Sequence, residues 1–136
     1  MALQILFQAE FSSAHWNARQ AFEVYANHFE VAADISEFAW TLVDGVWNNK
    51  RELDSLIETH SPHWHVSRMA FVDKNILRMA TFELSHLHEK VPPKVAIDEA
   101  IEIAKRYGSQ ESSAFVNGVL DNIAKSLPQL RGGLAG

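Results

Sequence analysis

The chain has 136 residues, contains no cysteine and carries a formal net charge of −5. This length favours one domain with a core large enough to fold without disulfides. The lack of cysteine excludes disulfides, thiolate zinc sites and cysteine nucleophiles, and the acidic balance argues against a simple nucleic-acid binder, because affinity for phosphates comes mostly from Lys and Arg. The acidity is uneven, however, since residues 1–66 hold three basic and nine acidic side chains and residues 67–136 hold nine basic and eight acidic ones.

Apolar residues recur at helical spacing along the first half of the chain and predict three helices there. We expect these helices over about residues 2–14, 18–30 and 35–58. Gly45 lies inside the third helix, where glycine costs about 1 kcal/mol relative to alanine. We therefore expect another helix to approach the backbone closely at Gly45.

Ser61-Pro62 interrupts the pattern, and the second half predicts a short segment around residues 64–70 and three further helices. The first runs from Asp73, its expected N-cap, to about Leu87, and the second runs from the two prolines 92–93 to Gly108. The third runs from Ser109, its expected N-cap, to about residue 126. The chain as a whole predicts an all-α, single-domain bundle of about seven helices over residues 1–127, followed by a flexible tail, 128–136.

The first residues are apolar but lack the basic start and the long apolar run of a secretory signal. No stretch approaches the roughly 20 apolar residues that span a bilayer. We therefore expect a cytoplasmic protein with no membrane partner.

Motifs for nucleotide binding, serine hydrolases and zinc proteases are missing from the sequence, so we expect no enzyme, no cofactor and no metal site. Two clusters offer weak alternatives. His60, His63 and His65 surround the proline break, where solvated loop histidines are the expected interpretation. Asp98 and Glu102 lie one helical turn apart near a helix N-terminus, where acids are favoured in any case.

Two tryptophans, Trp40 and Trp47, lie seven residues apart beside the apolar stripe of the long helix predicted in the first half. Packing in the core or at an interface explains such residues in most proteins. A stacking platform for bases is the less favoured alternative.

One aromatic residue of the last predicted helix, Phe115, lies about 100° from the centre of that helix's apolar stripe. Lys105, Arg106 and Tyr107 end the preceding helix. Two aromatic rings beside two cations, close to the free N–H groups of a helix start, fit a site that holds a phosphate and stacks a base. The alternative is that Phe115 only flanks the core.

Three stretches of the second half resemble the NusB family of bacterial transcription antitermination factors. They are VDKNILR with FEL (72–78 and 82–84), VPPKVAIDEA with AKRYG (91–100 and 104–108), and FVNGVLD (115–121). Weaker similarity extends back through LVDG (42–45) to ALQILF (2–7). The resemblance implies an all-α fold of two small helical subdomains and a role without catalysis.

The resemblance also implies partners. Proteins of this family pair with the ribosomal protein NusE, and the pair binds boxA RNA and acts with the transcription elongation complex on ribosomal RNA operons. By motif position, Phe115 and Glu111 resemble RNA-contacting positions, with Tyr107 as their neighbour. Phe7 and Asp73 resemble positions at the NusE surface. Arg78 is a further candidate for that surface, with an ion pair to an acid as its alternative.

The sequence departs from the family pattern at its start. Family members usually carry an Arg-rich segment ahead of the stretch matching residues 2–7, and here Met1 directly precedes that stretch. We expect either that the sequence begins downstream of such a segment or that the chain binds RNA weakly. Two other functions stay open: a homodimeric protein-interaction module, and an accessory domain derived from an RNA methyltransferase.

Overall fold

The computed structural model describes residues 33–61 and 65–128, and all regular structure in these ranges is helical. The elements are α3 (Ala33–Asn48), α4 (Lys50–Thr59), the 3-10 helix η1 (Val66–Arg68), α5 (Phe71–His86), α6 (Pro93–Tyr107) and α7 (Ser112–Ser126). The predicted all-α fold is thus confirmed. The two helices predicted within residues 1–30, the candidate residue Phe7 and the predicted tail beyond Pro128 lie outside the described residues.

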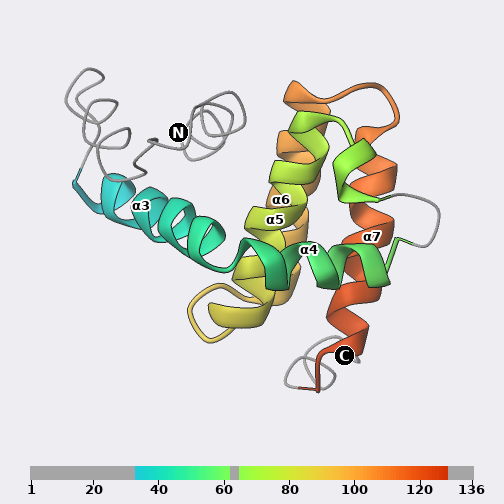
Figure 1. Cartoon of the computed structure of the whole chain (residues 1–136). Coiled ribbons are helices and arrows are strands. Elements are labelled where there is room, and N and C mark those ends of the chain that lie inside the picture. Colours follow the sequence, from blue (N-terminus) through green and yellow to red (C-terminus); the bar gives the residue numbers. More distant parts are fainter. Residues whose placement is uncertain (1–32, 62–64, 129–136) are drawn as a thin grey trace, which may run out of the picture.

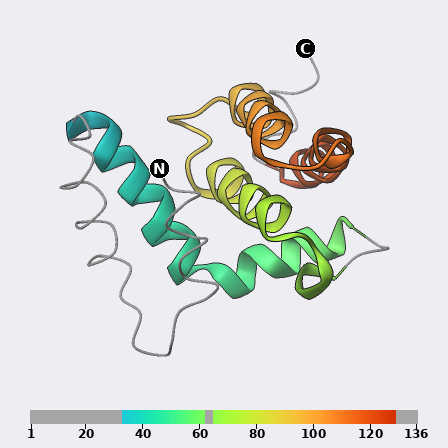
Figure 2. The same cartoon turned by 90° about the horizontal axis from the view of Figure 1, so that it is seen from above.

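Helices α5, α6 and α7 pack against one another and enclose several fully buried residues. The core between them includes Leu77 and Leu84 of α5 and Leu120 and Ile123 of α7, all with at most 1% of their surface exposed. α5 begins, α6 ends and α7 begins at the same end of this group, at the top of Figure 1. α3 and α4 lie on the side of α5 that faces away from α6 (Figure 2). No helix in the described part is long and apolar enough to cross a membrane.

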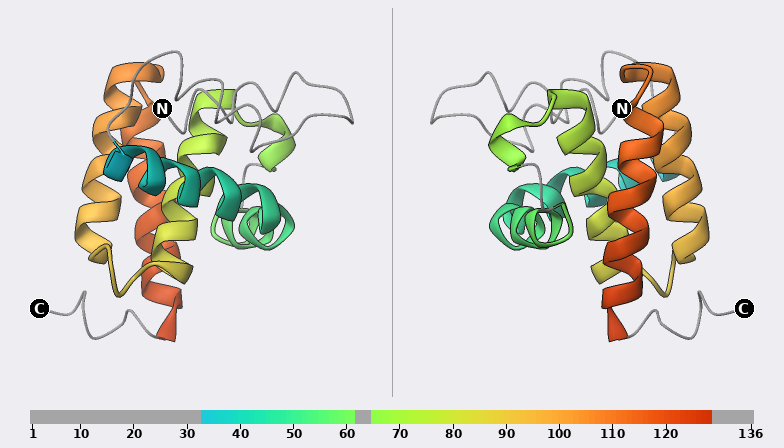
Figure 3. Two further views of the ribbon diagram at one scale, coloured as in Figure 1. Left: turned by 90° about the vertical axis from the view of Figure 1, so that its left-hand side faces the viewer. Right: turned by 90° about the vertical axis from the view of Figure 1, so that its right-hand side faces the viewer.

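The single helix predicted over residues 35–58 is wrong at Asn49, where the structure separates α3 from α4. In the side views of Figure 3, α4 is seen nearly end-on while α3 runs across the picture. The side chain of Asn49 donates to the carbonyl oxygen of Gly45 (Nδ2 to O, 2.8 Å), which also accepts the backbone N–H of Asn49 at 3.1 Å. The bend lets Val43 of α3 and Leu53 of α4 both be fully buried.

The close approach expected at Gly45 is observed, although the neighbour is a side chain and not a backbone. A Cβ atom at this position would lie 2.1–2.5 Å from three ring atoms of Phe82, which belongs to α5. The glycine therefore lets the Phe82 ring pack directly on the backbone of α3.

The two predicted N-caps are wrong. α5 begins at Phe71, so Asp73 is its third residue and complements the helix dipole without capping it. α7 begins at Ser112, and Ser109 instead donates its backbone N–H to the hydroxyl of Ser112 (N to Oγ, 2.9 Å). Gly108 ends α6 as predicted, and a Cβ there would lie 2.5 Å from the Ser112 hydroxyl, so the tight turn between α6 and α7 requires glycine.

Burial raises the pKa of Glu83 on α5 from its usual 4.5 to about 7, and the nearby carboxylate of Glu99 on α6 adds to the rise. The folded protein therefore holds a proton on Glu83 that the unfolded chain loses near pH 4.5. Stability contributed by the neutral form is present below pH 4.5 and is lost as the pH rises through about 7.

Replacing Glu83 with glutamine should stabilise the protein at pH 8 and leave its stability at pH 4.5 nearly unchanged. The gain at pH 8 is at most about 3 kcal/mol, because one pKa unit corresponds to about 1.4 kcal/mol. Urea unfolding of both proteins at the two pH values measures it. A gain that is equal at both pH values would show that the effect comes from packing and not from ionisation.

Candidate nucleic-acid interface

A groove of about 290 Å³ opens where α5 and α7 begin, beside the end of α6. Three elements line it: the turn of η1 with the residues after it, the first turn of α5, and the start of α7. The lining residues are Arg68, Met69, Ala70, Asp73, Ser109, Glu111, Ser112 and Phe115. The groove therefore brings together Phe115, Glu111 and Asp73, which the sequence predicted from two separate motifs.

Phe115 lies in the first turn of α7, half-buried, with one part of its ring packed on the core and another in the groove. Its neighbour Val116 is fully buried and holds this side of α7 against the core. The position at the border of the apolar stripe is thus as predicted, because the ring flanks the core and also lines the groove. That the ring stacks a base stays a prediction.

The two carboxylates that line the groove, Asp73 and Glu111, come from the start of α5 and from the N-cap of α7. Glu111 is exposed at the N-cap position of α7, where its side chain makes no capping hydrogen bond. Asp73 is half-buried, and its Oδ1 atom is buried without a hydrogen-bond partner. A buried acceptor left unpaired costs about 1–3 kcal/mol, so this oxygen lowers the stability of the first turn of α5.

Lys105, Arg106 and Tyr107 end α6 next to the groove, and none of the three lines it. Tyr107 is 49% exposed, and the guanidinium of Arg106 lies 5.5 Å from the centre of its ring. Lys105 forms an exposed ion pair with Glu102 (Nζ to Oε1, 3.4 Å). These side chains form an exposed aromatic and cationic rim beside the groove and not its wall.

Arg78 is corrected from a surface contact to a buried ion pair. Only 5% of the residue is exposed, and its guanidinium binds both carboxylate oxygens of Asp54 on α4 (Nε to Oδ1, 2.7 Å; Nη2 to Oδ2, 3.0 Å). A guanidinium stays charged at this depth, so its burial is tolerated only when a partner compensates the charge. The alternative that the sequence left open for Arg78, a pair with an acid, is the one observed.

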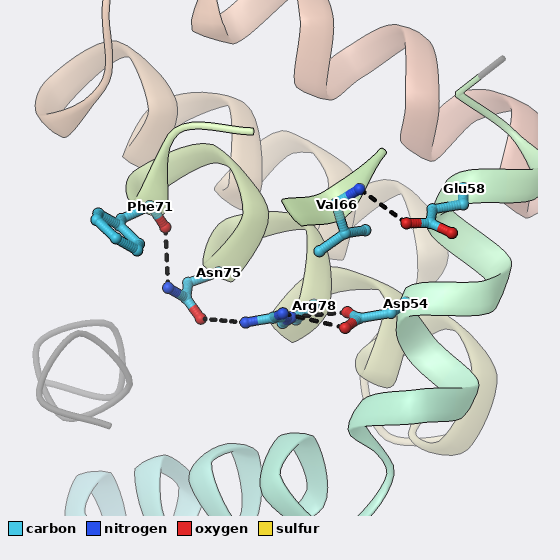
Figure 4. Close-up of polar contacts among 6 residues, drawn as sticks. All are labelled: Asp54, Glu58, Val66, Phe71, Asn75 and Arg78. Atoms are coloured by element: carbon cyan, nitrogen blue, oxygen red, sulfur yellow. Dashed lines mark hydrogen bonds and ion pairs between the residues drawn. The ribbon is translucent and has the colours of Figure 1, made fainter. Parts of the chain in front are cut away.

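Polar contacts connect α4 to two of the three elements that line the groove, η1 and α5 (Figure 4). Arg78 donates to the side-chain oxygen of Asn75 (3.3 Å), and Asn75 donates to the carbonyl oxygen of Phe71 at the start of α5 (2.9 Å). The backbone N–H of Val66 in η1 donates to Glu58 of α4 (2.9 Å). α4 therefore fixes the position of the turn and of the helix start that line the groove.

The remaining clusters singled out in the sequence have structural explanations. Nδ1 of His60 lies 2.8 Å from the carbonyl oxygen of Leu56, His65 is exposed, and His63 lies outside the described residues. No group of three potential ligands that could hold a metal ion occurs in residues 33–61 and 65–128. Asp98 is exposed on α6, as expected for a solvated face.

Trp40 and Trp47 lie on α3 and do not line the groove. Trp40 packs against the core, as predicted. Trp47 is 39% exposed, with the ammonium of Lys50 5.5 Å from its ring centre.

One lining residue, Arg68, was not singled out in the sequence. It precedes Asp73 by five residues, just outside the motif that carries the resemblance. The sequence predicts the start of this helix at Asp73, five residues after Arg68. Because α5 begins at Phe71, Arg68 lies closer to its first turn than we expected.

Comparisons with known proteins agree with the motifs. A family model described as "NusB family" matches residues 1–125. The chain is 44% identical over 121 residues to the transcription antitermination protein NusB of Syntrophus aciditrophicus (strain SB), covering 89% of this chain and 73% of that protein. It resembles the structure of T. maritima NusB with a TM-score of 0.84 and 40% identity, covering 98% of this chain and 92% of that one. A crystal structure of antitermination factors NusB and NusE in complex with dsRNA has a TM-score of 0.81 and 28% identity, covering 93% and 92%.

Proposed function

The chain belongs to the NusB family, and on that premise we propose that it is a transcription antitermination factor that binds boxA RNA together with NusE. It supports transcription of ribosomal RNA operons in the cytoplasm, by binding and not by catalysis. The observation that carries the proposal is the groove that Phe115, Glu111 and Asp73 line together. The similar solved assembly of NusB, NusE and RNA supports the choice of partners.

We assign a role to three side chains that line the groove and to three on its rim. Phe115 stacks a base, and Glu111 accepts hydrogen bonds from base edges, which present donors in single-stranded RNA. Asp73, which lines the groove, accepts a donor of NusE. Tyr107, Arg106 and Lys105 extend the surface along the rim, where exposed cations contact phosphates without reading the sequence.

A titration of labelled boxA RNA against the chain, NusE and their mixture at one fixed salt concentration tests the proposal. The mixture should bind boxA RNA more tightly than either protein alone, and more tightly than it binds a scrambled RNA. Equal affinity for both RNAs would overturn the proposal. A homodimer that NusE does not dissociate, measured by light scattering, would favour the interaction module instead.

Replacing Phe115 with leucine should weaken boxA binding by about tenfold, because base stacking on an aromatic ring contributes about 1–3 kcal/mol. Leucine keeps most of the apolar volume that packs on the core, so the melting temperature should change little. Binding titrations and thermal melts on the same samples measure the two effects separately.

Phe38→Ala is the matched control, since it removes an exposed ring of α3 that does not line the groove. It should bind RNA as the wild type does. If Phe115→Leu also binds normally, the ring of Phe115 serves the core alone.

A further inference from the structure

The backbone of Arg68 is held firmly while its side chain reaches solvent. Arg68 is the last residue of η1, and its backbone N–H donates to the carbonyl oxygen of His65 at 2.9 Å. Val66 and Met69 on either side of the turn are buried, and Glu58 of α4 binds the N–H of Val66. The exposed guanidinium therefore projects from a fixed turn at the wall of the groove.

The guanidinium of Arg68 makes no hydrogen bond or ion pair with another described residue, although two carboxylates, of Asp73 and Glu111, line the same groove. Arg78, by contrast, binds its aspartate with two parallel hydrogen bonds. Arg78 therefore holds α5 to α4 through an ion pair, whereas Arg68 holds no described residue in this way.

Arg68 is also the one cation among the eight residues that line the groove in the described part of the chain. A phosphate backbone approaching Phe115 meets the negative charges of Asp73 and Glu111, which repel it. A planar guanidinium offers several donors for phosphate oxygens and compensates that repulsion locally. The cations on the rim do not replace it, since Lys105 and Arg106 end α6 and neither lines the groove.

We infer that Arg68 binds a phosphate group of the RNA segment whose base stacks on Phe115. This inference rests on the proposed function, because it presumes that RNA enters the groove. Arg68 then anchors the backbone on the η1 side while Phe115 holds a base on the α7 side. The contact adds affinity for any RNA sequence and does not select a base.

The test is Arg68→Ala in the full chain, mixed with NusE and titrated with boxA RNA and with scrambled RNA at several salt concentrations. Affinity for both RNAs should fall by about tenfold, as expected for one charge-assisted contact. The slope of log affinity against log salt should become less steep by about 0.7, because one fewer phosphate is neutralised. Arg68→Lys should restore part of the affinity and the full slope.

Arg51→Ala is the control, since it removes the same charge from an exposed position of α4 outside the groove. It should leave affinity and slope unchanged, and both variants should melt at the wild-type temperature. If the wild type does not prefer boxA to scrambled RNA, the proposed function fails. If the wild type does and Arg68→Ala keeps its affinity and slope, only the role of Arg68 is overturned. A loss confined to the affinity for NusE without RNA would also overturn it.

Discussion

Asp54→Ala is expected to lower the free energy of unfolding by about 3–5 kcal/mol. The substitution removes the two hydrogen bonds between Asp54 and the guanidinium of Arg78, and only 6% of that arginine side chain is exposed to water. The buried guanidinium then loses the carboxylate that compensates most of its desolvation. Asn75, which also accepts a hydrogen bond from Arg78, is neutral and cannot replace a carboxylate.

Urea unfolding of Asp54→Ala and of Asp121→Ala makes a matched comparison. Asp121 pairs with Lys125 on α7 (Oδ2 to Nζ, 2.8 Å), but both side chains are about half exposed, so this loss should be at most about 1 kcal/mol. Adding Arg78→Met to Asp54→Ala should recover most of the stability, because it removes the buried charge that Asp54 no longer compensates. Equal losses in the two single variants would show that the ion pair with Arg78 contributes no more than a surface pair.

The same substitution should affect the groove. The hydrogen bonds that run from Asp54 through Arg78 and Asn75 end at Phe71, where α5 begins. Without Asp54, these hydrogen bonds no longer hold the first turn of α5, which carries Asp73, in a fixed position. RNA and NusE binding should therefore weaken at temperatures where Asp54→Ala is still folded.

The helix boundaries could be predicted from the sequence where a nearby glycine or proline sets them. Gly108 ends α6, and the two prolines begin it, because both effects act within one turn. The break at Asn49 and the start of α5 at Phe71 could not be predicted in this way. The break accompanies the full burial of Val43 and Leu53 against the rest of the fold, which no local pattern contains. The start of α5 carries no capping side chain, because Ala70 precedes Phe71.

Some residues of the candidate site could likewise be predicted from the sequence, and others could not. The resemblance to the NusB family, confirmed by the family match, led to Phe115, Glu111 and Asp73, and the structure places all three in one groove. The sequence could not show that Arg78 is buried. An arginine in the middle of a helix can either contact a partner at the surface or form an ion pair within the fold. Nor could it show Arg68 beside Phe115, because the two are 47 positions apart and meet only in the folded chain.

Gly45→Ala should destabilise the protein by about 1–3 kcal/mol, even though alanine favours a helix by about 1 kcal/mol over glycine. The added Cβ would lie 2.1 Å from a ring carbon of Phe82, so the ring or the helix must move. The ring has little room, because Phe82 is 7% exposed and stacks on His86 with ring centres 5.0 Å apart. Phe82→Leu in the same chain should reduce the loss by removing the rigid ring.

Gly118→Ala makes the same chemical change in a helix where nothing lies within 4 Å of the new Cβ. Its effect should have the opposite sign, a gain of about 0.5–1 kcal/mol, since only the helix preference of alanine remains. Urea unfolding of the two variants therefore separates packing from backbone preference with one substitution type. If Gly45→Ala stabilised the protein as Gly118→Ala does, the Phe82 ring would not pack on α3 as the structure places it.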